Sequence, residues 1–132
     1  MVYAIEPEPG DISLIQANAE AFGVPNVRAI SGRAPEALAE LPDPEAVFVG
    51  GTGRQVEPVL TAAYERLVPG GRLAVNVVTI DGLASAHAAL KRLAGEVRIW
   101  NVSISRGIEQ MDRVRFEAVN PTFLLAVVKE RT

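Results

Sequence analysis

The sequence predicts an α/β fold with a mostly parallel sheet, and three observations support this prediction. Short apolar runs rich in β-branched residues alternate with segments of helical spacing over most of the 132 residues. The run at residues 46–49 ends in Gly50, Gly51 and Gly53, as a buried parallel strand does where a ligand approaches the backbone. The last two strands follow each other without a helix between them, which indicates an antiparallel hairpin at the edge of the sheet.

Composition narrows the class of protein. Hydrophobic residues make up 48% of the chain, and the net charge of −3 argues against non-specific binding to nucleic acid or to an anionic membrane. The absence of cysteine excludes a disulfide framework and a thiolate metal site, and it fits a cytoplasmic protein. No apolar run has the length of a membrane span, and no signal peptide is recognised at the start. We expect a single domain, cytoplasmic, without nucleic-acid or membrane partners.

The first strand is expected at residues 2–5, and it stops at Glu6 because Pro7 cannot donate to a β-ladder. A carboxylate at the carboxyl end of a parallel strand is placed to accept hydrogen bonds from both hydroxyls of a ribose. The alternative interpretation of Glu6 is an ordinary exposed glutamate before a turn.

A helix is expected over residues 10–22, and Gly23 ends it. Its apolar face consists of Ile12, Ile15, Ala19 and Phe22. A second strand at residues 27–30 leads into a loop, and Pro35 suits the first turn of a helix that runs to about Leu41.

The alternation continues with a helix at residues 55–67 and a strand at residues 72–78. Either Thr79 or Asp81 caps the next helix. The one histidine, His87, lies beside the apolar stripe of that helix, with no Ser, Cys or metal ligand at a suitable spacing. We therefore predict no catalytic side chain and no metal site.

The end of the chain has a different pattern. Residues 96–105 have the pattern of a long strand whose apolar parity switches, which predicts a bulge near Trp100. Residues 106–120 are polar and charged, and residues 123–128 form the last strand.

The glycine-rich loop after residue 49 matches neither of two common nucleotide-binding motifs. A P-loop requires Lys and then Ser or Thr after its last glycine, where this chain has Arg54 and Gln55. The Rossmann fingerprint requires a glycine where Val56 stands.

The order of elements resembles the Rossmann-like sheet of class I S-adenosyl-L-methionine-dependent methyltransferases without its first strand and helix. Glu6 corresponds to the acid that binds the cofactor ribose in that family, and Gly32-Arg33-Ala34 follow the next strand, where the family surrounds the adenine. Residues 67–73, Leu-Val-Pro-Gly-Gly-Arg-Leu, resemble the turn that the family carries before its fifth strand.

Several segments, spread over essentially the whole chain, resemble the decarboxylating precorrin-6Y C5,15-methyltransferases of cobalamin biosynthesis. The most discriminating are the G-x-A-P-E-A-L pattern at residues 32–38 and Phe-Val-Gly-Gly at residues 48–51; Ala-Ile-Glu at residues 4–6, residues 17–24 and Asn-Pro-Thr-Phe at residues 120–123 also match. Amino-group methyltransferases usually carry N-P-P-[YF] after the fourth strand, where this chain has Gly-Gly-Thr-Gly, which disfavours N-methylation of a planar amine.

The resemblance implies methylation of a tetrapyrrole carbon and loss of carbon dioxide from an acetate side chain, with S-adenosyl-L-methionine as cofactor. The residues that it assigns to the cofactor are Glu6, Pro7, Gly32, Arg33, Ala34 and Gly50, and those for the precorrin substrate are Gly51, Thr52, Gly53, Arg54 and Arg106. Arg113 and Arg115 are further candidates to bind substrate carboxylates, with a solvated surface charge as the alternative for each arginine. The family often forms homo-oligomers, so the resemblance adds a homo-oligomer as one candidate assembly that the sequence alone does not decide.

The first strand of the family and its D-x-G-x-G-x-G loop, which holds the methionine end of the cofactor, would precede Val2 and are absent. We expect weak or no cofactor binding by this polypeptide alone, and an N-terminally truncated methyltransferase domain over residues 1–132. Two other hypotheses stay open: a class I methyltransferase acting on RNA or protein, and a non-catalytic remnant or interaction module of the same fold.

Overall fold

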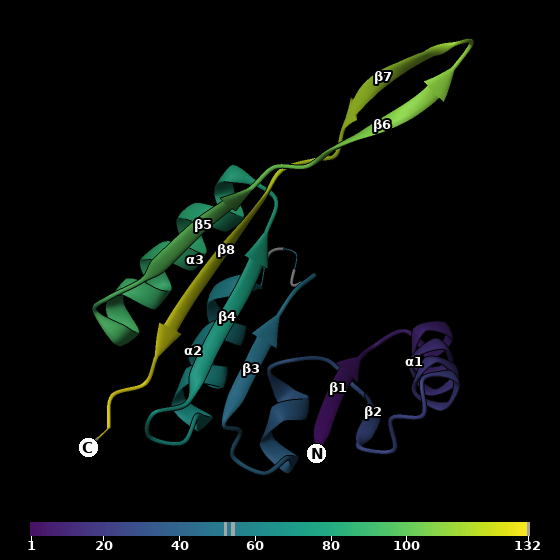
Figure 1. Ribbon diagram of the computed structural model, residues 1–132. Helices are drawn as coiled ribbons and strands as arrows, with labels where there is room; N and C mark the ends of the chain where they lie inside the picture. The colour runs from purple at the N-terminus through teal and green to yellow at the C-terminus, as the bar shows by residue number, and fades with distance from the viewer. Residues whose placement is uncertain (52, 54, 132) are drawn as a thin grey trace. The chain divides into compact units, whose positions relative to one another are not determined.

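The fold is described from a computed structural model, which describes residues 1–51, 53 and 55–131. The chain divides into two compact units, Met1–Pro42 and Asp43–Thr132, and each is treated separately below. Figure 1 shows the helices and strands of both units.

The first unit is a pair of parallel strands with one long helix. Strand β1 (Val2–Glu6) leads into helix α1 (Pro9–Ala21), and strand β2 (Val27–Ser31) is followed by the short helix η1 (Glu36–Glu40). The two strands pair in register from Val2 opposite Val27 to Glu6 opposite Ser31. Both predicted strands are confirmed, and their carboxyl ends lie at the same edge.

Two expectations for this unit are wrong in detail. Phe22 does not belong to the inward face of α1: it is the C-cap residue and is 81% exposed, because Gly23, with a φ of +62°, turns the chain away after Ala21. The segment after Pro35 is a 3₁₀-helix rather than a longer regular helix, and Pro35 precedes it instead of lying in its first turn.

The second unit is a four-stranded sheet with two helices. Its elements are β3 (Ala46–Val49), α2 (Val56–Arg66), β4 (Arg72–Val77), α3 (Ile80–Ala94), β5 (Arg98–Val102) and β8 (Thr122–Val128). The strand order is β3-β4-β8-β5. Strands β3 and β4 are parallel, and β8 is antiparallel to both β4 and β5, so β8 alone reverses direction.

The core of this unit lies between the sheet and the two helices, which lie on one side of it (Figure 1). The largest side chains that are fully buried are Leu60, Leu73, Leu90, Leu125 and Val75. Along β4 the alternate residues Leu73, Val75 and Val77 are buried, which leaves Ala74 and Asn76 on the opposite face of the sheet. Of these β4 side chains, those on the face opposite the helices are therefore the ones available to a ligand.

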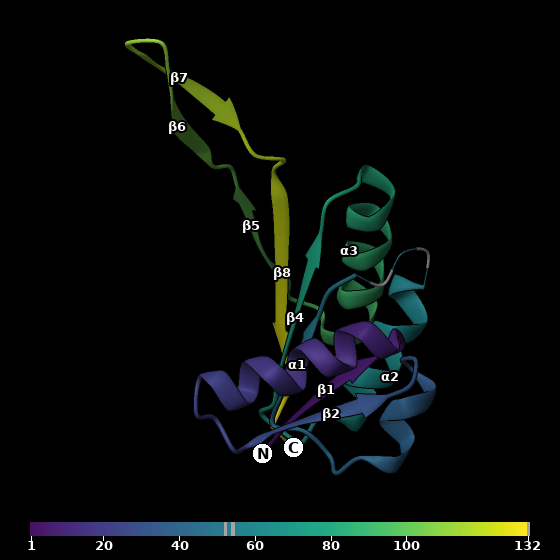
Figure 2. The ribbon, with the colours of Figure 1, turned by 90° about the vertical axis from the view of Figure 1, so that its right-hand side faces the viewer.

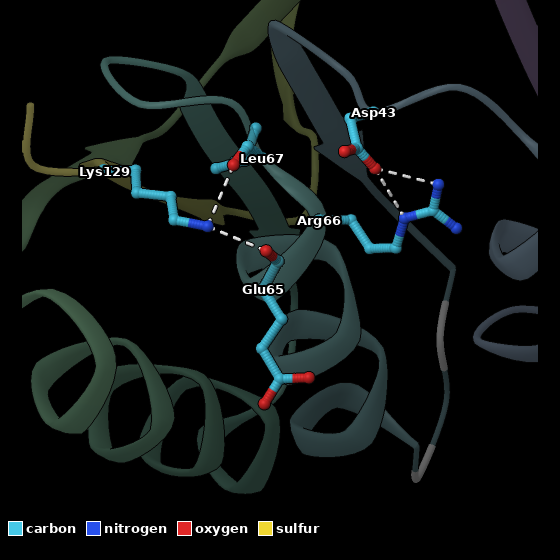
Figure 3. Close-up of polar contacts among 5 residues, drawn as sticks. All are labelled: Asp43, Glu65, Arg66, Leu67 and Lys129. Carbon is cyan, nitrogen blue, oxygen red and sulfur yellow. Dashed lines mark hydrogen bonds and ion pairs between the residues drawn. The ribbon is translucent and has the colours of Figure 1, made fainter. Parts of the chain in front are cut away.

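Polar contacts fix both helices at their ends. The Thr79 side chain accepts a hydrogen bond from the Gly82 amide at 3.0 Å, so Thr79, and not Asp81, is the N-cap of α3. The Lys129 ammonium donates to the carbonyl oxygens of Glu65 and Leu67 at the end of α2 (Figure 3).

The segment between β5 and β8 departs from the expectation. The β5–β8 ladder pairs residue for residue through Trp100 opposite Leu124, so the predicted bulge near Trp100 is wrong. The apolar parity switches inside β5 without an extra residue, because Ile99 lies on one face of the sheet and Trp100 and Val102 lie on the other. Strands β6 (Ser105–Gln110) and β7 (Arg113–Ala118) form a separate hairpin, which no sequence pattern predicted.

This β6–β7 hairpin projects from the end of the sheet where β5 stops and β8 starts (Figures 1 and 2). Its turn places Met111 and Asp112 at positive φ, as a two-residue turn between twisted strands requires. One face carries Val114 and Phe116, which are 60% and 78% exposed. The other face carries Arg106, Arg113, Arg115 and Glu117 around Ile108.

Within the described ranges, no helix combines the length and the apolar character that crossing a membrane requires.

Candidate functional site

The carboxyl edge of the β1–β2 pair brings the predicted ribose ligand next to the predicted adenine loop. Glu6 is half-buried, and its Oε1 accepts a hydrogen bond from the Glu8 amide at 3.0 Å. The Glu6 carbonyl oxygen accepts from the Gly32 amide at 3.2 Å, which holds the two segments together. Because one carboxylate oxygen is oriented by the backbone, the other remains available to a hydroxyl group.

The loop after β2 is tight where the adenine is expected. A Cβ atom on Gly32 would lie 3.0 Å from the Ala37 Cβ atom, so a larger residue here would displace η1, to which Ala37 belongs. The Arg33 carbonyl oxygen accepts from the Ala37 amide at 3.0 Å. Arg33 and Pro7 are exposed, and Ala34 is half-buried. The structure thus gathers all five cofactor candidates of the first unit at one edge.

The carboxyl end of β3 carries the candidates of the second unit. Gly50 follows the buried Val49 and is exposed, and a Cβ atom on Gly50 would lie 3.7 Å from the Phe48 ring. Gly51 and Gly53 have φ values of +64° and +56°, which favour glycine. The substrate candidates Thr52 and Arg54 lie outside the described residues.

Arg106 is on β6 of the hairpin rather than on the sheet. Its guanidinium forms an ion pair with the Glu117 carboxylate at 3.1 Å, and its side chain is 70% exposed. Arg115 lies 3.8 Å from the same carboxylate and donates to Gln110 Oε1 at 3.1 Å. Glu117 therefore partly neutralises both arginines, and a substrate carboxylate at this face would compete with it.

Sequence reasoning missed a polar pair at the carboxyl edge of the sheet. The Thr122 hydroxyl on β8 donates to Oδ1 of Asn76 on β4 and lies 3.3 Å from the Val77 carbonyl oxygen. The sequence contains one indication of this pair, because Asn76 is the polar residue within the apolar run at residues 73–78. The contact itself joins residues 46 positions apart and cannot be read from a local pattern.

The architecture is that of class I methyltransferases, as structural comparison shows. The structure of an S-adenosylmethionine-dependent O-methyltransferase from Thermotoga maritima superposes on 99% of this chain with a TM-score of 0.76. The two sequences are 19% identical, so this similarity establishes the fold alone. The family assignment is more specific. The model of the precorrin methyltransferase domain family matches residues 1–129, and the chain belongs to this family.

Curated relatives agree. The chain is 34% identical over 125 residues to a probable cobalt-precorrin-6B C(15)-methyltransferase (decarboxylating) from Pyrobaculum calidifontis, covering 94% of this chain and 64% of the relative. It is 49% identical over 93 residues to a precorrin-6Y C(5,15)-methyltransferase from a Sinorhizobium species, covering 70% of this chain and 22% of the relative. The chain thus spans less than two thirds of either protein.

Among solved structures, the precorrin-6Y C5,15-methyltransferase from Geobacter metallireducens superposes with a TM-score of 0.88 at 31% identity. That match covers 96% of this chain and 67% of the other. The expected fold and family are confirmed.

Proposed function

We propose that this chain is part of an enzyme of cobalamin biosynthesis that methylates a carbon of a precorrin with S-adenosyl-L-methionine and decarboxylates an acetate side chain. The observation that carries the proposal is the family match over residues 1–129, together with the position of Glu6 at the carboxyl edge of β1. Because that match spans both units, we infer one methyltransferase domain over residues 1–132.

Glu6 and the Gly32 loop suit the adenosine part of the cofactor. The Glu6 carboxylate would accept hydrogen bonds from the ribose, and the Glu8 amide keeps it oriented. Gly50 would allow close approach of the ligand to the β3 backbone. When bound, the cofactor supplies an activated methyl group as the electrophile.

The protein has to align a macrocycle carbon with that methyl group and keep water out. The new bond joins the macrocycle carbon to the methyl carbon, and the electron pair of the broken bond stays on sulfur. In the decarboxylation, the carbon–carbon bond of the acetate breaks, its electron pair enters the conjugated macrocycle, and a proton replaces carbon dioxide. The chain needs no nucleophile of its own for either step. Gly51, Thr52, Gly53, Arg54 and Arg106 are the proposed substrate residues.

Cofactor binding tests the first part. Because weak cofactor binding is expected of this chain by itself, equilibrium titrations with S-adenosyl-L-methionine extend to high ligand concentration. In them, Glu6→Gln should weaken binding about tenfold or more, because it removes a charged acceptor. Glu8→Gln, in the same turn, is the matched control and should bind like the parent. Equal affinities of the two variants would remove Glu6 from the proposal.

Product analysis tests the second part. With methyl-labelled cofactor and a tetrapyrrole precursor, the product should gain one methyl group and lose one carbon dioxide, as read by mass spectrometry. Transfer of the label to RNA or protein instead would favour a class I methyltransferase that acts on one of those substrates. No transfer to any of them, with folded protein, would favour a non-catalytic module.

Self-association also stays a proposal, and the β6–β7 hairpin is the surface that supports it. A two-stranded hairpin with one apolar face exposed is only marginally stable in water, and the same face of a second copy would cover Val114 and Phe116. Sedimentation velocity of the parent and of Phe116→Glu tests this. A monomeric parent at micromolar concentration would contradict it.

A further inference from the structure

Asn76 is a polar side chain on a mostly apolar face of the sheet in the second unit. It lies on β4 opposite Leu124 of β8, and its flanking residues Val75 and Val77 point to the other face, where they are 0% and 7% exposed. The covering helices therefore do not bury Asn76, which is half-buried on the face that carries Phe48 of β3.

Gly50 follows β3 at the same end of the sheet as Asn76. Val49 is the last residue of β3 and pairs with Val75, so the next residue on each strand, Gly50 and Asn76, lie next to each other where the strands end. A Cβ atom at position 50 would lie 3.7 Å from the Phe48 ring, on the face of the sheet that carries Phe48 and Asn76. The glycine-rich loop and Asn76 therefore belong to one edge.

The hydrogen-bonding capacity of Asn76 is only half used. Its Oδ1 accepts from the Thr122 hydroxyl, which fixes the orientation of the amide. Among the described residues no acceptor is found for its Nδ2 group, which carries two N–H donors. No side-chain nitrogen in the described part of the chain is both buried and unpaired, so Nδ2 is open to solvent or to a ligand.

We propose that Asn76, oriented by Thr122, donates a hydrogen bond from Nδ2 to a carboxylate of the ligand that binds at the carboxyl edge of β3 and β4. The inference rests on the proposed function, in which both ligands carry such a group: the acetate and propionate side chains of the tetrapyrrole and the amino-acid end of the cofactor. Thr122 acts as a positioning residue because the hydrogen-bond partners of its hydroxyl in the described part of the chain are Asn76 and the backbone of Val77.

Binding to two probes tests the proposal and separates the two sources of carboxylate. The probes are uroporphyrin I, a carboxylate-rich tetrapyrrole, and S-adenosylhomocysteine, each titrated into the full 132-residue chain. A porphyrin that carries only cationic substituents serves as the probe control. Asn76→Ala should weaken binding of at least one carboxylate probe about tenfold or more, as expected when a hydrogen bond to a charged group is lost. It should leave the cationic porphyrin unaffected.

Substitutions at Asn76 and Thr122 test the hydrogen-bond donor and its orientation separately. Asn76→Asp keeps the shape but replaces the donor by a charged acceptor, and it should weaken binding more than Asn76→Ala. Thr122→Val should weaken binding by a smaller factor, and Thr122→Ser should restore it. The matched control is Asn101→Ala, because Asn101 Oδ1 accepts from the Ser103 hydroxyl at 2.9 Å in the same chemical arrangement elsewhere on the sheet.

The outcomes discriminate between two kinds of failure. If the parent binds a probe and both Asn76 variants bind it with the same affinity, Asn76 has no role in binding. The proposed function is then unaffected. No binding of either probe by the parent overturns this inference and the ligand-binding part of the proposed function together. Circular dichroism and the thermal midpoint of each variant show whether it is folded; if Asn76→Ala is not, the comparison of Thr122→Val with Thr122→Ser decides.

Discussion

Replacing Lys129 by methionine should destabilise the second unit by about 1.5 kcal/mol. The Lys129 ammonium lies 2.7 Å from the Glu65 carbonyl oxygen and 2.9 Å from that of Leu67, so it caps the carboxyl end of α2 (Figure 3). It also lies 5.6 Å from the centre of the Tyr64 ring. Methionine preserves most of the aliphatic stem and removes the charge and both hydrogen bonds.

The expected change in stability is the balance of three contributions. Two hydrogen bonds from a charged donor contribute about 3 kcal/mol at the lower end of their range, and ordering the lysine side chain costs about 2 kcal/mol. A positive charge at the carboxyl end of a helix adds about 0.5 kcal/mol. Together these contributions leave about 1.5 kcal/mol of stabilisation.

Urea unfolding at pH 7 measures the effect, with fluorescence of Trp100, the one tryptophan, as a reporter located in the second unit. Arg92→Met is the matched control. It breaks the ion pair of Arg92 with Glu57, whose two side chains are 58% and 56% exposed, and should cost less than about 0.5 kcal/mol. A change for Lys129→Met no larger than that of the control would refute the reasoning.

Three further predictions concern single positions. Thr79→Ala removes the acceptor for the Gly82 amide and should lower the free energy of unfolding by about 1 kcal/mol in urea titrations, whereas Thr79→Ser should keep it. Gly71→Ala would place a Cβ atom 2.8 Å from the Val68 carbonyl oxygen, so we expect a lower thermal midpoint and less soluble protein. Burial raises the pKa of the Tyr64 phenol above its ordinary value of 10.0, so the stability that depends on its neutral form is complete below pH 10 and is lost as the pH rises through the raised pKa. Absorbance at 295 nm of the parent and of Tyr64→Phe measures that titration, and a Tyr64 transition at or below pH 10 would contradict it.

Local patterns were sufficient for most of the elements. The apolar runs at β3 and β4 and the helical spacing of α2 placed these elements almost to the residue, because glycine and proline mark their ends. The helical spacing of the apolar residues in α2 agrees with the structure, since Val56, Val59, Leu60 and Ala63 are all buried. Glu6 and the Gly32 loop could be placed at one edge because parallel strands end on the same side.

The hairpin of β6 and β7 was missed for a physical reason. Its strands alternate charged residues with Ile108, Val114 and Phe116, but glycine and adjacent charges interrupt the pattern, and no part of the hairpin contributes to the core. Strand pairing without burial leaves a weak signal in the sequence, since the hydrophobic period arises from burial. The predicted bulge at Trp100 was wrong because β5 carries apolar residues on both faces, Ile99 on one and Trp100 and Val102 on the other, so the switch in parity marks no extra residue.

The sequence by itself determined the order of the strands and helices other than β6 and β7, and the two glycine-marked strand ends, because these depend on backbone preferences and on the spacing of apolar residues along a few turns. The tertiary structure alone decided which distant groups meet. Thr122 and Asn76 are 46 residues apart, and Lys129 and Glu65 are 64 apart. Both contacts exist because β8 runs antiparallel beside β4, an arrangement set by packing of the whole sheet rather than by any local segment.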